Sequence, residues 1–318
     1  MPDVNIPSVD QLLTVIQALA PLIRTHADEA ERNRRLSPVV VRALAEAGLF
    51  RMYTPRTLGG FEVDPLTFYR VVEAIARIDG STGWCVFIAG GNPLLGAFLA
   101  DEAAEKVFGN DPQVITAGVV HPYGTAILSH GGYRVTGRWS YASGCQHASW
   151  VFCCCQVFDG DQKCLTDDGE PDVRLFFVPS EHITIVETWD VSGLAGTGSH
   201  DVVIDQVFVP AAYTCAFKPG ITPQGGCYRS PVYRYVLYAS FALAIGAVTG
   251  DCPGGGGRVS GAGTIEKAER WDGDVARSPT VPSPYRGGGG AGALGPGLVA
   301  HGGPADLAIA PRQWARHL

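Results

Sequence analysis

The chain has 318 residues, 46% of them hydrophobic and 17% charged, with a formal net charge of −7 at pH 7. This length and hydrophobic content exclude a disordered tail or a minimal binding module and predict about two folded domains. The net negative charge argues against a nucleic-acid-binding surface. The sequence also lacks a run of about 18 apolar residues and the basic-then-apolar start of a signal peptide. We therefore expect a soluble, cytoplasmic protein that does not enter a membrane.

The chain contains 9 cysteines, and three of them are consecutive, Cys153–Cys155. An odd number without a secretory signal argues against a disulfide framework. Consecutive residues of a strand point to alternate faces, so these three side chains cannot converge on one metal ion. No Cys-x-x-Cys pair or suitably spaced histidine adds ligands to them. We predict reduced thiols that pack as small core residues, and no metal site.

Helical patterning fills the first third of the chain, which we assign to a helical domain over residues 1–112. Capping residues and proline at the first helical position mark where helices begin. The expected helix starts are Ser8, Ser37-Pro38, Asp64-Pro65 and Asp101. Proline removes a backbone donor, so we expect Pro21 to interrupt or restart the first helix.

Residues 113–230 change to short apolar runs separated by glycine, proline and aspartate, which predicts a small antiparallel barrel or sandwich. The expected strands cover 115–120, 125–129, 133–140, 150–158, 174–178, 183–187 and 201–209. A helix then returns over about 233–248, and we assign residues 231–249 to the first helix of a C-terminal domain.

Residues 250–318 lose the apolar periodicity of a folded domain. Of the 41 glycines in the chain, 17 lie between Gly250 and Gly303. Such a composition buries too little apolar surface to offset the entropy of ordering, so we expect disorder. This segment is either a flexible tail or the product of a reading-frame break near Thr249. The chain has 20 arginines and only 4 lysines, typical of a GC-rich gene whose shifted frames encode Gly, Ala, Arg and Pro; we favour the frame break.

Four segments, taken in order, carry a resemblance to a known superfamily. They are 48–60, 79–84, 137–150 and 189–210. The first two resemble the Pro…Gly-Gly loop and the next helix start of the acyl-CoA dehydrogenase superfamily. The third is similar to the hydroxylase branch of that superfamily, and the fourth to its β domain. The resemblance implies a multidomain α+β fold: an N-terminal all-α domain, a central antiparallel β-barrel or sandwich, and a C-terminal four-helix bundle that we expect to be largely missing here.

The resemblance is strongest to the two-component flavin-dependent monooxygenases. It implies reduced FMN or FAD supplied by a separate flavin reductase, and molecular oxygen as cosubstrate. The implied reaction is hydroxylation of a phenol or an aromatic polyketide, in which the flavin performs the oxygen chemistry and the protein supplies a dry pocket. The family forms dimers or tetramers through its C-terminal helices, so the loss of those helices would remove that surface.

Three residues are the catalytic candidates that the resemblance implies. His121 stands where the dehydrogenases carry the acidic residue of a Thr-Glu-Pro turn, and an imidazole there could orient or deprotonate a phenol. Ser143 lies on a turn that reaches the same pocket, and His147 follows it. Each histidine could instead be structural, with His121 hydrogen-bonded to the backbone of its loop. For His147 we favour the structural role.

The flavin-binding candidates lie in three places. Trp139 and Ser140 resemble the aromatic-plus-hydroxyl element that packs on the isoalloxazine and hydrogen-bonds to it. Thr125 ends the stretch 119–125, which also contains His121. The resemblance places a glycine-rich loop near the flavin phosphate or the subunit interface, with candidates Gly196, Thr197 and Ser199. The alternatives are a core tryptophan and a tight β-turn.

Two other functions compete with the hydroxylase. An acyl-CoA dehydrogenase would use a carboxylate base from the C-terminal helices, so the absence of that base here does not separate the two. The histidine at 121 and the stretch 143–150 favour the hydroxylase. The glycine-rich tail favours a third possibility, an inactive truncated remnant or a binding protein.

Overall fold

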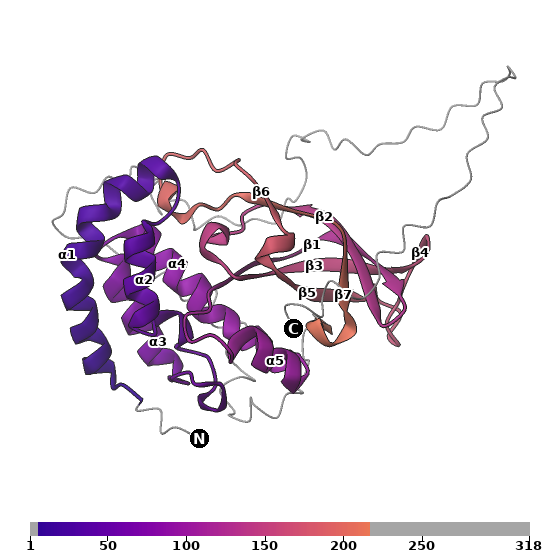
Figure 1. Cartoon of the computed structure of the whole chain (residues 1–318), viewed down its shortest axis with the longest axis horizontal. Helices are drawn as coiled ribbons and strands as arrows, with labels where there is room; N and C mark the ends of the chain where they lie inside the picture. The colour runs from indigo at the N-terminus through magenta and orange to yellow at the C-terminus, as the bar shows by residue number, and fades with distance from the viewer. Residues whose placement is uncertain (1–5, 217–318) are drawn as a thin grey trace, which may run out of the picture. The chain divides into compact units, whose positions relative to one another are not determined.

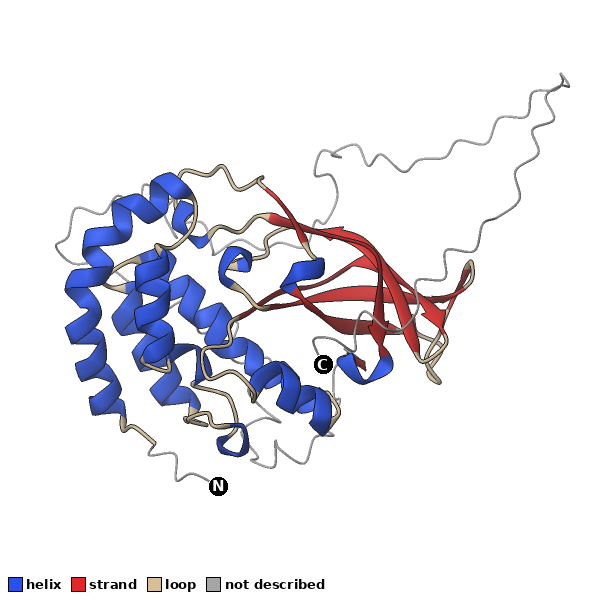
Figure 2. Cartoon of the chain, viewed as in Figure 1, coloured by secondary structure: helices blue, strands red, loops and turns tan. Residues whose placement is uncertain are grey.

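The computed structural model describes residues 6–216 (Figure 1). The expected helix over 233–248 and the glycine-rich segment 250–318 therefore lie outside the described residues. The described helices are α1 (Val9–Asn33), α2 (Pro38–Glu46), α3 (Pro65–Ala76), α4 (Gly80–Gly91) and α5 (Asp101–Phe108). They pack together beside a sheet, as the two colours of Figure 2 show. None of these helices is long and apolar enough to cross a membrane.

The helix starts that the sequence predicts are confirmed. Ser8 forms a capping box with Gln11, and the Asp64 carboxylate accepts from the backbone N–H groups of Leu66 and Thr67. The prediction for Pro21 was wrong, because α1 runs through it as one helix of 25 residues. Ile16 and Ile23 are buried on either side of the proline, and this packing outweighs the hydrogen bond that proline cannot donate.

The strands form one sheet in the order β6-β7-β2-β1-β3-β5-β8, with β4 paired to β3. Their bounds are β1 (Thr116–Ser129), β2 (Gly132–Trp139), β3 (Trp150–Asp159), β4 (Gln162–Lys163), β5 (Val173–Pro179), β6 (Thr184–Val186), β7 (Asp201–Pro210) and β8 (Thr214–Ala216). The strands expected over 115–120 and 125–129 are the two halves of β1. The α+β fold class is confirmed, with one difference in detail: β1 and β3 pair in parallel, so the sheet is mixed and not purely antiparallel.

A bulge divides β1 where it runs beside β3. Val119 pairs with Cys153 and Gly124 pairs with Cys155, so residues 120–123 stand opposite Cys154 alone. The indole of Trp139, which is 0% exposed, donates from Nε1 to the Cys154 carbonyl at 2.8 Å. A Cβ at Gly124 would overlap the Trp139 ring, so the residue that closes the bulge must be glycine. Trp139 therefore fixes the base of the bulge.

The cysteines behave as predicted. All seven in the described part of the chain are free thiols, and every one except Cys164 is buried. Cys153, Cys154 and Cys155 are all 0% exposed although they point to alternate faces of β3. Strand β3 is therefore covered on both faces.

Two contacts join the helices to the sheet. The Phe108 ring, on α5, meets the Phe177 ring, on β5, edge to face with 6.1 Å between centroids. The Asn92 amide, directly after α4, donates to the Thr116 carbonyl at 2.8 Å where β1 begins. The loop between β2 and β3 contacts α4 through Ser143 and Trp84, and the loop between β6 and β7 contacts α1 through Glu31.

Candidate functional site

A chain of four buried or half-buried side chains crosses the junction between α4 and the sheet loops. Trp84 Nε1 donates to Ser143 Oγ at 2.9 Å, Ser143 Oγ lies 2.8 Å from Ser199 Oγ, and Ser199 Oγ lies 2.7 Å from Thr197 Oγ1. Thr197 Oγ1 donates to the Leu194 carbonyl at 2.8 Å. Three of the residues that the sequence singled out, from two distant segments, thus meet in one network.

The backbone on either side of Ser143 is held by the same loop. Ala142 donates its N–H to the His200 carbonyl at 3.0 Å, and Gly144 donates to the Thr197 carbonyl at 2.9 Å. Two backbone bonds and one hydroxyl bond therefore join Ser143 and its neighbours to residues 197–200. A position fixed in this way has little freedom to adjust to a ligand.

Helix α1 clamps the glycine-rich loop through a single carboxylate. Glu31 accepts from the N–H of Ala195 at 3.2 Å, from the N–H of Gly196 at 3.0 Å and from Ser81 Oγ at 2.7 Å. A Cβ at Gly196 would stand 3.0 Å from the Ser81 Cβ, a tight contact to which Ser81 would have to adjust. The N–H of Gly196, expected near a flavin phosphate, is bonded to Glu31. The phosphate role of Gly196 stays a prediction.

The Glu31→Gln substitution tests this clamp. The glutamine side chain places its NH₂ group against one of the three groups that donate to the carboxylate of Glu31. Its remaining oxygen is uncharged, so the other hydrogen bonds are weaker. We expect the free energy of unfolding, measured by urea denaturation, to fall by about 1–3 kcal/mol, the cost of leaving a buried polar group unsatisfied. Asp28→Asn makes the same chemical change at an exposed position of α1 and should leave the unfolding free energy unchanged. Equal stability of the two variants would contradict the clamp.

The segment after β2 contains the exposed aromatic residue that sequence reasoning missed. Trp139 is completely buried, whereas Tyr141 is 69% exposed and has a φ of 68°. This left-handed backbone is costly for a bulky residue and turns the ring outward, where it meets the Trp189 ring edge to face at 5.9 Å. The Ser140 hydroxyl bonds to Asp201. The accessible aromatic face in this segment therefore belongs to Tyr141.

The Asp201 carboxylate accepts hydrogen bonds from several side chains around the end of β2. Burial raises the pKa of its carboxyl group, but donors from Arg138, Thr188 and Ser140 outweigh that effect and lower it. Arg138 Nε donates to Asp201 Oδ2 at 2.7 Å, and Thr188 Oγ1 donates to Asp201 Oδ1 at 3.0 Å. Ser140 therefore belongs to a charged cluster between β2 and β7.

The bulge of β1 presents the candidate His121 to solvent. The His121 and Tyr123 rings stack with 4.4 Å between centroids and 6° between planes, and both side chains are exposed. Thr125 is also exposed, and its hydroxyl reaches the Thr136 carbonyl only at 3.4 Å. These two candidates lie on the outer surface of β1 and take no part in the buried hydroxyl chain.

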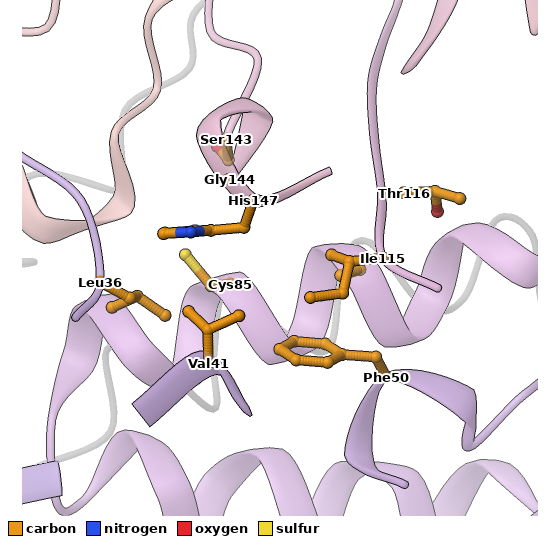
Figure 3. A pocket seen from close by; sticks show the side chains of 10 residues that line it. Leu36, Val41, Phe50, Cys85, Ile115, Thr116, Ser143, Gly144 and His147 are labelled. Carbon is orange, nitrogen blue, oxygen red and sulfur yellow. The ribbon is translucent and has the colours of Figure 1, made fainter. Parts of the chain in front are cut away.

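His147 lines a small pocket between the helices and the turn that follows β2 (Figure 3). The cavity volume is about 10 Å³, roughly the space that one water molecule needs. Its lining residues are Leu36, Val41, Phe50, Cys85, Ala89, Ile115, Thr116, Ser143, Gly144 and His147. Figure 3 shows the His147 ring facing the Cys85 sulfur, with Leu36 and Val41 beyond it. Ser143 and His147 thus share one largely apolar cavity.

The chemistry of His147 follows from that cavity. Burial, with a smaller contribution from the positive charge of Arg35, lowers the pKa of His147 to about 4. The imidazole is therefore neutral at pH 7. Its Nε2 atom is buried and finds no hydrogen-bond partner among the described residues. A neutral ring with this pKa is a weak base, which favours hydrogen bonding to a ligand over proton transfer.

Comparison with known proteins identifies the family to which the chain belongs. Residues 13–107 match the acyl-CoA dehydrogenase N-terminal domain. The oxygenase subunit HsaA of a flavin-dependent monooxygenase from Rhodococcus jostii is 38% identical over 227 residues, which cover 69% of this chain and 56% of the relative. HsaA from Mycobacterium tuberculosis (strain ATCC 25618 / H37Rv) is 33% identical over 271 residues, covering 81% of this chain and 67% of the relative.

A solved structure gives the same picture in three dimensions. XiaF from Streptomyces sp., in complex with FADH2 and glycerol, has a TM-score of 0.66 and 29% identity, covering 76% of this chain and 60% of that chain. The chain thus spans between 56% and 67% of the length of the two curated relatives. The resemblance noted in the four sequence segments is confirmed. The chain belongs to the acyl-CoA dehydrogenase superfamily, in its branch of flavin-dependent monooxygenase oxygenase subunits.

Proposed function

We propose that the chain is the oxygenase component of a two-component monooxygenase that hydroxylates an aromatic or phenolic substrate, with aromatic polyketides included. Reduced flavin comes from a separate reductase, and molecular oxygen is the cosubstrate. The observation that carries the proposal is the buried hydroxyl chain at Ser143 beside the exposed Tyr141, in a chain whose relatives are oxygenase subunits.

The described residues fit a flavin in their chemistry. An isoalloxazine ring needs a flat aromatic face and a hydrogen-bonding group at its edge. Tyr141 offers such a face, held outward by a left-handed backbone of the kind that clusters at ligand sites. Ser143 follows two residues later and supplies a hydroxyl oxygen. We propose that Tyr141 takes the stacking role expected of Trp139, and that Ser143 bonds to the ring. The flavin, FMN or FAD, supplies the oxygen chemistry when bound.

We propose different roles for the two candidate histidines, His121 and His147. Imidazole is the side chain most often used for proton transfer, and we propose that His121, exposed on the bulge, orients the substrate hydroxyl and accepts its proton. His147 faces an apolar cavity with its unpartnered Nε2 atom and would hold a polar group of the substrate.

The reductase and the cellular location are part of the same proposal. Among the described strands, the parallel pair β1 and β3 is joined through β2 and a short 3-10 turn, and not through a crossover α-helix. The described residues thus hold no dinucleotide-binding unit that could take up a nicotinamide cofactor, which supports a separate reductase as partner. The free thiols of the described residues fit a reducing compartment, and we propose the cytoplasm.

A reconstitution experiment tests the proposal. The purified chain is mixed with FMN or FAD, NADH, oxygen and a panel of phenols, with and without a flavin reductase. We expect hydroxylated product only when the reductase is present, because the described residues contain no unit that binds a nicotinamide cofactor. Chemically reduced flavin should replace the reductase. Product formed from NADH without a reductase, or no product with reduced flavin, would refute the two-component assignment.

A further inference from the structure

The hydroxyl chain at Ser143 has only one possible direction. The Leu194 carbonyl can only accept, so Thr197 must spend its single proton on that bond. Ser199 must then donate to Thr197, and Ser143 must donate to Ser199. Each hydroxyl has one proton, and each is already used.

This direction leaves Ser143 a single remaining capacity. A hydroxyl oxygen has two lone pairs, and one of them accepts the Trp84 indole N–H at 2.9 Å. The proton points to Ser199. Ser143 Oγ can therefore accept one further hydrogen bond and can donate none. The backbone bonds of Ala142 and Gly144 to the 197–200 segment keep the serine from turning away.

We propose that this polarised chain selects the redox state of the flavin, an inference that rests on the proposed contact between Ser143 and the ring. The N5 atom of oxidised flavin has a lone pair and no proton, whereas N5 of reduced flavin carries an N–H. Because Ser143 Oγ can only accept, it forms a hydrogen bond with the N5–H of reduced flavin. With oxidised flavin, the lone pair of Ser143 Oγ faces the lone pair of N5, and the two repel each other. Thr197, Ser199 and Trp84 are positioning residues, because they act on the flavin only through Ser143.

The selection serves an oxygenase that receives its flavin from another protein. The reduced form must bind in competition with oxidised flavin in the same solution, and the oxidised form must leave after each turnover. A ratio of dissociation constants, oxidised over reduced, expresses this preference. One hydrogen bond gained in one state and opposed in the other corresponds to a ratio of about tenfold or more.

Two substitutions remove the polarity without touching Ser143. Thr197→Val replaces the hydroxyl of a buried residue with a methyl group of similar shape, so Ser199 can turn its proton toward Ser143. Ser199→Ala removes the acceptor of the Ser143 proton outright. In both variants Ser143 becomes able to donate to N5 of oxidised flavin. Thr197→Ser keeps the hydroxyl and is the matched control, while Ser199→Ala keeps the test open if Thr197→Val fails to fold.

Anaerobic titration of the full chain with FMN and FAD, each oxidised or dithionite-reduced, gives the four dissociation constants by flavin absorbance and fluorescence. We expect the parent and Thr197→Ser to bind reduced flavin at least tenfold more tightly. In Thr197→Val and Ser199→Ala the ratio should fall about three- to tenfold, mainly through tighter binding of oxidised flavin. A tenfold fall corresponds to a shift of about 30 mV in the potential of the bound flavin.

The outcomes separate this inference from the proposed function. If the parent binds both redox states equally, or if both variants keep the parental ratio, the redox selection is overturned and the flavin site stands. If the parent binds neither state of either flavin, both the inference and the proposed function fail.

Discussion

Replacing Trp139 by alanine should lower the free energy of unfolding by about 3–5 kcal/mol, the usual cost of removing a large buried aromatic side chain. The ring is 0% exposed, and its Nε1 atom holds the Cys154 carbonyl at 2.8 Å. Trp139→Phe keeps an aromatic ring but leaves that buried carbonyl without the indole donor. We expect it to cost about 1–3 kcal/mol. Urea denaturation followed by circular dichroism measures both values.

Trp150→Phe is the control for Trp139→Phe. Trp150 also lies at the end of a strand, but it is only half-buried and stacks on Tyr213 with 5.6 Å between centroids. A phenyl ring preserves most of that stacking, so its stability loss should be the smaller of the two. Hydrogen exchange of residues 119–125 should accelerate in Trp139→Phe and not in Trp150→Phe. If Trp139→Phe were as stable as the parent, the indole would not be what fixes the bulge.

The second large effect is expected on activity and not on stability. His121→Ala should reduce the rate of hydroxylation by about 10²–10⁴-fold, the usual contribution of a positioned acid or base. Its ring is exposed on the bulge and contacts Tyr123, and exposed substitutions usually change unfolding free energy by at most about 0.5 kcal/mol. The measurement is product formed with reductase present, alongside the hydrogen peroxide released.

His130→Ala is the matched control, since His130 is also an exposed histidine and lies in the turn after β1. It should keep both the rate and the stability of the parent. Two results would return His121 to a structural role: unfolding of His121→Ala under conditions where the parent is folded, or hydroxylation by His121→Ala at the parental rate without extra peroxide.

Local signals in the sequence predicted the elements well. A serine or aspartate followed by proline predicted where α2 and α3 begin. Asp64 caps α3 through its side chain, whereas Ser37 makes no side-chain cap bond and at α2 the proline alone removes an orphan N–H. Alternating apolar residues predicted most of the strands. The error at Pro21 has the opposite cause, since the continuity of α1 depends on burial against other helices, which no local pattern displays.

The site was predicted in part. Ser143, Thr197 and Ser199 were singled out separately, and their meeting depends on a sheet that brings residues more than 50 positions apart into hydrogen-bond distance. Tyr141 was missed because its exposure follows from a left-handed backbone at one residue. Glu31 was missed because its partners lie 164 and 165 positions away along the chain. A carboxylate in a polar helical stretch gives no sign of such a partner.

Under the oxygenase activity proposed above, the consecutive cysteines of β3 bear on how the chain withstands peroxide. Enzymes that activate oxygen on flavin release some peroxide, and peroxide attacks thiolates far faster than thiols. Burial raises the pKa of Cys154 to about 12 and that of Cys145 to about 11, so almost no thiolate exists at neutral pH. The neighbouring thiols of Cys153 and Cys155 are shifted in the same direction by the same burial. Burial on both faces of β3 thereby keeps these thiols protonated, the form that reacts slowly with peroxide.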